Sequence, residues 1–355
     1  MTKDVPMSKK LSLFIFIFAL SLLFDGGLLA KGPGHYSEAA DIFEFIDHAS
    51  GWHEKSDQGY RTVLLREGKL TSAQEQLLSR YAKLRKKEYE NSSIQSKMIK
   101  EDDTFGNIPF GYDHFSRSFY SSNTIREALL NLKKEGVPAE DIQFLNELYK
   151  SFAPKLKPFI KESAQFAVKL IEFNKQWKYS GRDRALKLTK GFVLGKKGRK
   201  WNLTMLPVWS PGTVLPSVDI RGEFLILRYN PLTQTENWDY TDILKKAVAA
   251  VFYAQDLEQR ENLSKLFKLK CNGREYEFQE ATQIAFGAML PRYIKTKRKF
   301  NLYERWSSKV FVDVYAKLLF PLMEENIKNK GTFSGFFMEQ SSFLCRQLHQ
   351  LAIRP

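Results

Sequence analysis

The fold is indicated by two short β-rich stretches, Trp201-Asn-Leu-Thr-Met-Leu-Pro-Val-Trp209 and Glu223-Phe-Leu-Ile-Leu-Arg-Tyr229. Short apolar runs rich in β-branched and aromatic side chains, bounded by turn residues, are typical of strands. Pro211-Gly212 and Arg221-Gly222 supply the turn residues. Apolar residues then return at helical spacing across Asp239–Gln255. The sequence therefore predicts a small sheet followed by a helix.

The chain before these strands, residues 31–180, is predicted to be a helical N-terminal region. Capping boxes at Ser72–Glu75 and Thr124–Glu127 mark the start of two helices, because a Ser or Thr side chain there satisfies free N–H groups. Pro154 and Pro158 are expected to interrupt a later helix, since proline lacks the N–H that a helix interior needs.

Residues 181–355 are predicted to form an α+β core with C-terminal helices. A hairpin is expected over Lys268–Phe278, because Asn272-Gly273 is a strong hairpin signal. Further helices are expected over 279–293, 305–328 and 333–351. The order of helices, small sheet and helices indicates a mostly helical α+β fold with a small mixed or antiparallel sheet.

The first 30 residues have the pattern of a secretory signal peptide. Lysines occur in Met1–Lys10, the apolar run Leu11–Phe24 follows, and Ala30 offers a cleavage position. Fourteen helical residues rise only about 21 Å, which is short of the roughly 30 Å of a bilayer core. We therefore expect cleavage near Ala30, export to the periplasm or the exterior, and no stable membrane span afterwards.

The chain of 355 residues is strongly basic, with 55 Lys and Arg against 40 Asp and Glu, a net charge of +15. Such an excess favours polyanionic partners. An exported protein does not meet chromosomal DNA, so we expect no nucleic-acid partner. Anionic envelope polymers or lipids are the better candidates.

One basic segment stands out between residues 182 and 200. Its cations are Arg182, Arg184, Lys187, Lys190, Lys196, Lys197, Arg199 and Lys200, against one acid, Asp183. Clustered cations beside aromatic residues can bind polyanions by charge and stacking. The alternative is a solvated hairpin loop at Gly195-Lys-Lys-Gly198.

Few other motifs indicate a catalytic or ligand-binding function. Phosphate-binding glycine loops, nucleophile elbows and HExxH are all absent, and His53-Glu54 lacks the second histidine of a zinc motif. Cys271 and Cys345 are either two buried thiols or, in an oxidising compartment, a disulfide. We predict no metal and no cofactor.

The region from 200 to 290 resembles the zincin-type metallopeptidases, in which strands precede a helix with HExxH and a later helix supplies a glutamate ligand. Glu280-Ala-Thr-Gln-Ile-Ala-Phe-Gly287 is similar to a signature of exported, zincin-like bacterial proteins of unknown function. Asp41–Asp47 and Gln74–Tyr89 also resemble the N-terminal part of that family. The resemblance implies a zincin-like scaffold.

The expected catalytic positions are lost in this sequence. In the HExxH frame, Lys245 and Lys246 replace the first ligand and the catalytic glutamate, and Ala249 replaces the second ligand. A lysine ammonium has no lone pair for zinc, and Glu280 alone cannot hold the metal. We therefore expect a vestigial cleft in which Lys245 or Lys246 pairs with Glu280. The alternative is that the lysines are the solvated side of an ordinary helix.

These observations predict an exported, non-catalytic, zincin-like protein that binds peptide or an anionic envelope polymer. Two alternatives stay open at this point. One is a hydrolase of an unidentified class, and the other is a basic envelope-binding module built on residues 182–200. The ligand and the oligomeric state do not follow from the sequence.

Overall fold

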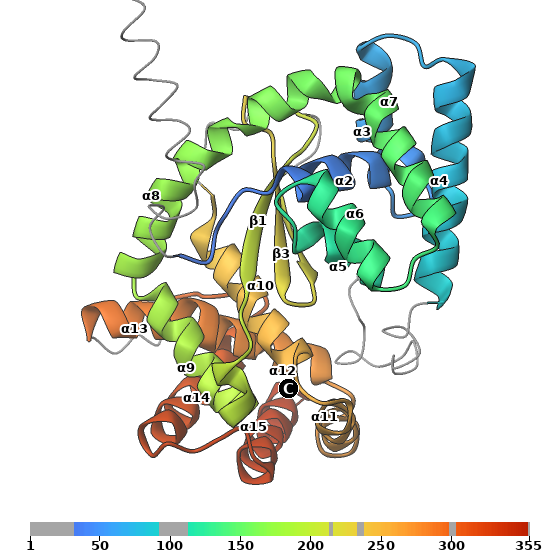
Figure 1. Ribbon diagram of the computed structural model, residues 1–355. Helices are drawn as coiled ribbons and strands as arrows, with labels where there is room; N and C mark the ends of the chain where they lie inside the picture. The colour runs from blue at the N-terminus through green and yellow to red at the C-terminus, as the bar shows by residue number, and fades with distance from the viewer. Residues whose placement is uncertain (1–31, 92–112, 213–215, 233–237, 298–302, 354–355) are drawn as a thin grey trace, which may run out of the picture.

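The computed structural model describes residues 32–91, 113–212, 216–232, 238–297 and 303–353. It is mostly helical, with one small three-stranded mixed sheet, which confirms the expected fold class. Figure 1 shows the sheet at the centre, with the helices of residues 38–163 above and to its right and the C-terminal helices below. The expected signal peptide lies outside the described residues.

The sheet is built from β1 (Thr204–Trp209), β2 (Ser217–Arg221) and β3 (Phe224–Tyr229). β3 is the central strand, parallel to β1 and antiparallel to β2. Gly222 allows the tight β2–β3 connection because its φ of 58° lies in the left-handed region. The chain at Gly34 forms a parallel bridge to Met205 and so covers part of the outer edge of β1.

The helices that precede the sheet in the sequence begin at residue 38. They are α2 (Glu38–Ser50), α3 (Gln58–Arg66), α4 (Ser72–Asn91), α5 (His114–Tyr120), α6 (Ile125–Lys134), α7 (Ala139–Ser163), α8 (Gln165–Tyr179) and α9 (Arg182–Leu194). A 3-10 turn, Gly195–Arg199, follows α9.

The remaining helices follow the sheet. They are α10 (Tyr240–Tyr253), α11 (Leu257–Lys270), α12 (Glu275–Ile284), α13 (Leu290–Thr296), α14 (Val310–Lys328) and α15 (Gly335–Ile353). A short π-helical segment, Ala285–Met289, joins α12 to α13.

Two apolar cores lie on opposite faces of the sheet. Leu206 and Ile226 pack with α2 to α7, whereas Met205, Leu225 and Leu227 pack with α8, α9 and the C-terminal helices. Because successive strand residues point to opposite faces, one apolar run such as β3 can serve both cores. This explains why the β3 side chains are buried along the whole strand.

The helix α2 carries buried charges as well as apolar residues. Arg85 on α4 is fully buried and pairs with Asp47 at 2.7 Å and with Asp113 at 2.8 Å. Burial alone would raise the pKa of Glu44, but the positive charge of Arg228 on β3 holds it well below its usual range. Buried charges need such partners, so these pairs fix α2 against the sheet and α4.

Two local predictions about the N-terminal helices need correction. The capping box of α4 uses Thr71 rather than Ser72, since Thr71 and Gln74 exchange hydrogen bonds of 3.2 Å; the box at Thr124 is confirmed. The interruption at Pro154 and Pro158 was wrong, because α7 runs through both. Both prolines are exposed, so the carbonyls that lose a helical partner can be hydrated.

The predicted hairpin at Asn272-Gly273 was also wrong. These residues connect α11 to α12, and both adopt positive φ values, 50° and 69°. Asn and Gly tolerate that conformation in helix ends as well as in hairpins. Cys271 at the end of α11 is bonded to Cys345 on α15, with a Cα–Cα distance of 5.8 Å.

The disulfide is compatible with an extracytoplasmic location, because such bonds persist in oxidising compartments. Within the described ranges, no helix is both long and apolar enough to cross a membrane.

Candidate functional site

The four positions of the expected vestigial cleft lie on α10 and α12, but they do not form the predicted pair. Ala249 is buried, and Lys245 and Lys246 are half-buried on α10. Glu280 on α12 pairs instead with Lys309, and the distance between Lys309 Nζ and Glu280 Oε2 is 2.7 Å. Among the ion pairs of the described residues, none joins Glu280 to Lys245 or Lys246, so this prediction was wrong.

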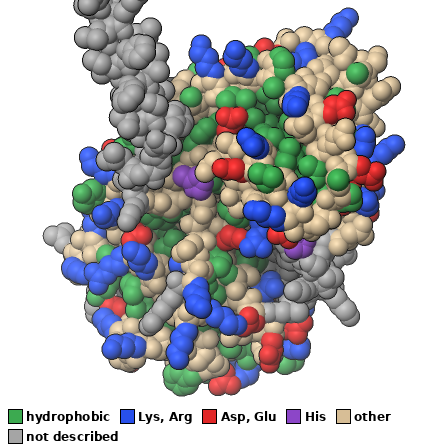
Figure 2. All heavy atoms as spheres, in the orientation of Figure 1, with side chains coloured by type: hydrophobic (Ala, Val, Ile, Leu, Met, Phe, Trp, Pro, Cys, Tyr) green, Lys and Arg blue, Asp and Glu red, His purple; other side chains and the backbone are tan. Residues whose placement is uncertain are grey.

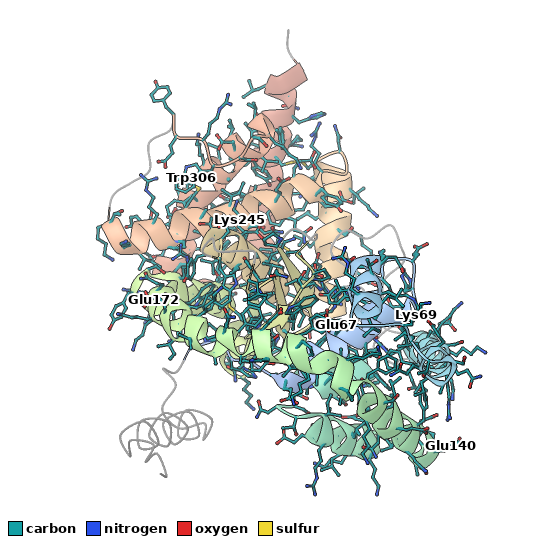
Figure 3. All side chains as sticks on the ribbon, turned by 90° about the horizontal axis from the view of Figure 1, so that it is seen from above. Glu67, Lys69, Glu140, Glu172, Lys245 and Trp306 are labelled. Atoms are coloured by element: carbon teal, nitrogen blue, oxygen red, sulfur yellow. A yellow bond between two sulfur atoms is a disulfide. The ribbon has the colours of Figure 1, made fainter. Side chains whose placement is uncertain are left out.

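The register between α10 and α12 explains the difference. A Cβ on Gly287 would lie 3.0 Å from the Cα of Lys245, and Gln279 Nε2 donates to Tyr253 Oη at 3.1 Å. The two helices therefore run antiparallel, with Glu280 near the level of Phe252. Seven helical residues separate that level from Lys245, about 10 Å along the axis. Figure 3 places Lys245 in the half formed by the C-terminal helices, away from Lys69 and Glu140.

The histidine singled out in the sequence has a local role in a turn. His53 Nδ1 accepts a hydrogen bond from the N–H of Lys55 at 3.1 Å. Across the part of the chain that the structure describes, no group of three or more His, Cys, Asp or Glu side chains is placed to hold a metal ion.

The basic segment 182–200 is helical rather than a hairpin loop. It comprises α9 and the 3-10 turn Gly195–Arg199. Arg182 lies over the ring of Tyr240, and Lys187 pairs with Asp183 at 2.8 Å. Among the cations whose side chains the structure describes, Arg184, Lys196, Lys197 and Lys200 are also exposed. Figure 2 shows Lys and Arg side chains over α8 and α9.

A pocket of about 320 Å³ lies at the C-terminal end of this segment. The 3-10 turn forms one wall, and the start of α11 forms another. Residues 332 and 333, between α14 and α15, complete it. The residues that line it include Lys196, Lys197, Gln255, Asp256, Gln259 and Phe333. The structure thus brings two of the predicted anion-binding residues, Lys196 and Lys197, into a concave site.

Two glycines shape the wall that carries the lysines. Gly195 has φ 54° and ψ −131°, a conformation that L side chains rarely adopt. A Cβ on Gly198 would lie 2.4 Å from the carbonyl oxygen of Lys190. Because neither Gly195 nor Gly198 carries a side chain, the turn can fold back tightly on α9. This fold-back holds Lys196 and Lys197 at the pocket.

The opposite wall offers hydrogen-bond donors. Asp256 is the residue before α11, but its side chain does not cap the helix; it pairs instead with Lys197 Nζ at 2.5 Å. The first N–H groups of α11 therefore have no side-chain cap, and this end of a helix carries partial positive charge. Gln255 is only 5% exposed, and its Oε1 has no hydrogen-bond partner among the described residues.

Sequence reasoning identified the lysines but missed the opposite wall. Asp256 before Leu257-Glu258 is a helix-start signal that could have located the beginning of α11. Nothing local to the sequence indicates that this helix end lies opposite residues 196 and 197. Comparison of the chain with protein-family models, with curated proteins and with solved structures finds no match.

Proposed function

We propose that this is an exported, non-catalytic protein that binds an anionic envelope polymer on the basic face of α9 and the 3-10 turn. The observation that carries the proposal is the concave site lined by Lys196 and Lys197 at the end of that face. A polymer with repeated negative charges can contact α9 along its length and place one unit in the pocket.

The charge balance of the face supports this function. Two carboxylates form ion pairs with cations of this face: Asp183 with Lys187 and Asp256 with Lys197. Arg184, Lys196 and Lys200 have no carboxylate partner among the described residues, so their charges are available to a polyanion. Cations gathered on one face raise the local concentration of anionic ligands and speed their association.

The non-catalytic part of the proposal rests on α10. Lys245, Lys246 and Ala249 occupy the frame in which a zincin-like scaffold would hold zinc, and they provide no ligand for it. A scaffold of this kind that has lost its metal would retain a binding role. The basic face favours a polyanion over a neutral peptide as the partner.

A titration with charged and neutral polymers tests the function. We expect polygalacturonate and polyphosphate to bind to the purified protein by calorimetry, and neutral dextran not to bind. Affinity is expected to fall as salt rises from about 50 to 200 mM, because salt screens exposed charges. Binding of an acidic peptide but of neither polymer would contradict the proposal.

A matched pair of double variants locates the binding face. Lys196→Gln with Lys200→Gln is expected to weaken polymer binding severalfold. The control, Lys83→Gln with Lys87→Gln, removes the same charge from exposed positions on α4 and should leave the affinity within about twofold. Equal losses in both variants would mean that net charge, and not this face, determines binding.

A further inference from the structure

We infer that the pocket between the 3-10 turn and α11 binds one hydroxylated, ring-sized acid, such as a uronate or a sugar phosphate, and that Asp256 competes with this acid for Lys197. This inference rests on the proposed function, because such an acid is the unit of an anionic envelope polymer. Beyond that function, we infer the chemical class of the bound unit and a residue, Asp256, that limits the affinity of the pocket for it.

The pocket has groups that suit one negative charge. Lys196 and Lys197 line one wall, and the uncapped start of α11, a helix of 14 residues, lies at the other. Helix N-termini bind anions through free N–H groups and the helix dipole. Cations and N–H groups on facing walls can contact the same acid group.

Gln255 is a second, unpartnered polar group in the pocket wall. It lines the pocket and is only 5% exposed, and its Oε1 is buried without a hydrogen-bond partner among the described residues. Buried amides in proteins are nearly always hydrogen-bonded, because leaving one unpaired costs free energy. An acid oxygen cannot pair with Oε1, since both are acceptors, but the NH₂ group at the other end of the amide can donate to a carboxylate or phosphate oxygen.

The rest of the lining suits a sugar ring. Val193 and Phe333 supply apolar surface, while Gln259 and Thr332 supply neutral hydrogen-bonding groups. A volume of about 320 Å³ falls at the small end of the range for ligand pockets, roughly 300–1,000 Å³. A ring with hydroxyl groups can use both kinds of surface, whereas a bare inorganic ion would leave most of them unused.

Asp256 occupies the position of a helix cap but does not act as one. Its carboxylate contacts Lys197 at 2.5 Å, and so it takes the place that a ligand anion would take. Aspartate is among the best N-cap residues. A ligand acid that binds Lys197 and the N–H groups at the start of α11 displaces the Asp256 side chain, which is exposed and can be hydrated instead. The ion pair that is lost reduces the affinity of the pocket for the acid.

Calorimetric titration with small acids tests the ligand class. We expect glucuronate and glucose 6-phosphate to bind to the full-length mature protein and glucose not to bind. Glucuronate carries a carboxylate and glucose 6-phosphate carries a phosphate. The acid that binds more tightly identifies which of these groups the pocket prefers. Equal binding of glucose would overturn the inference, as would unchanged affinity for the acids in Lys197→Gln.

The role of Asp256 is tested by Asp256→Asn, which keeps a capping side chain and removes the competing charge. We expect the affinity for the tighter acid to rise about two- to fivefold, in line with the modest strength of exposed ion pairs. Glu258→Gln, an exposed charge in the first turn of α11, is the matched control and should change the affinity less. Equal gains in both variants would show only a long-range charge effect and would refute the competition.

The outcomes separate this inference from the proposed function. If the polymers bind but neither small acid does, the pocket inference fails and the polymer function stands. If the polymers do not bind, the proposed function fails, and the inference that rests on it fails as well.

Discussion

Reduction of the Cys271–Cys345 disulfide should lower the stability of the protein substantially. The bonded residues are 74 positions apart, and both are buried in the C-terminal core. A crosslink mainly restricts the unfolded chain, and the loop-entropy model gives about 4.5 kcal/mol for a loop of this length. With a urea m-value of about 3 kcal/mol/M, the unfolding midpoint would fall by about 1.5 M.

Urea unfolding followed by tryptophan fluorescence measures this effect, with and without dithiothreitol. The double variant Cys271→Ala with Cys345→Ala is the control, and dithiothreitol should not move its midpoint. Identical midpoints for oxidised and reduced wild-type protein would refute the reasoning. So would free thiols at both positions in protein recovered from outside the cytoplasm, detected by alkylation and mass spectrometry.

Three further predictions concern charged residues. Burial raises the pKa of Asp41 to about 6 from 3.8, so the folded state holds the proton more tightly and stability falls by about 2 kcal/mol between pH 4 and pH 7. Urea unfolding of Asp41→Asn should lack this component. Arg85→Met should cost about 3–5 kcal/mol in the same assay, because it leaves two carboxylates buried without their cation; a loss below 1 kcal/mol would contradict this. A double-mutant cycle of Lys245→Met with Glu280→Gln should show no coupling, whereas Lys309→Met with Glu280→Gln should show a small one.

Local signals predicted the elements near the sheet well. The β-rich runs became β1 and β3, and the helix expected over Asp239–Gln255 is α10 (Tyr240–Tyr253). In a strand or a helix, the spacing of apolar residues shows which side of that one segment is buried. Such elements can therefore be predicted without knowledge of the rest of the fold. The sequence did not predict β2 as a separate strand, because Ser217–Arg221 is short and its burial is mixed.

The failures have a common physical origin in long-range packing. Asn272-Gly273 favours positive φ in a hairpin and in a helix connection alike, so the turn alone cannot decide between them. Glu280 was assigned to the wrong lysine because the register of α10 on α12 depends on the close approach of Gly287 to Lys245. The candidate site was half predictable for the same reason: its lysines are adjacent in sequence, whereas Gln255 and Phe333 reach the pocket only in the fold.

Lysine footprinting tests the central claim, that the basic face of α9 and its pocket bind an anionic polymer. The protein is acetylated briefly with and without polygalacturonate or polyphosphate, and modification at each lysine is quantified by mass spectrometry. We predict that at least one polymer will protect Lys196, Lys197 and Lys200, while the exposed lysines 83 and 87 on α4 react as in the free protein. Unchanged reactivity at residues 196, 197 and 200 under conditions in which the polymer binds, or equal protection on α4, would contradict the account.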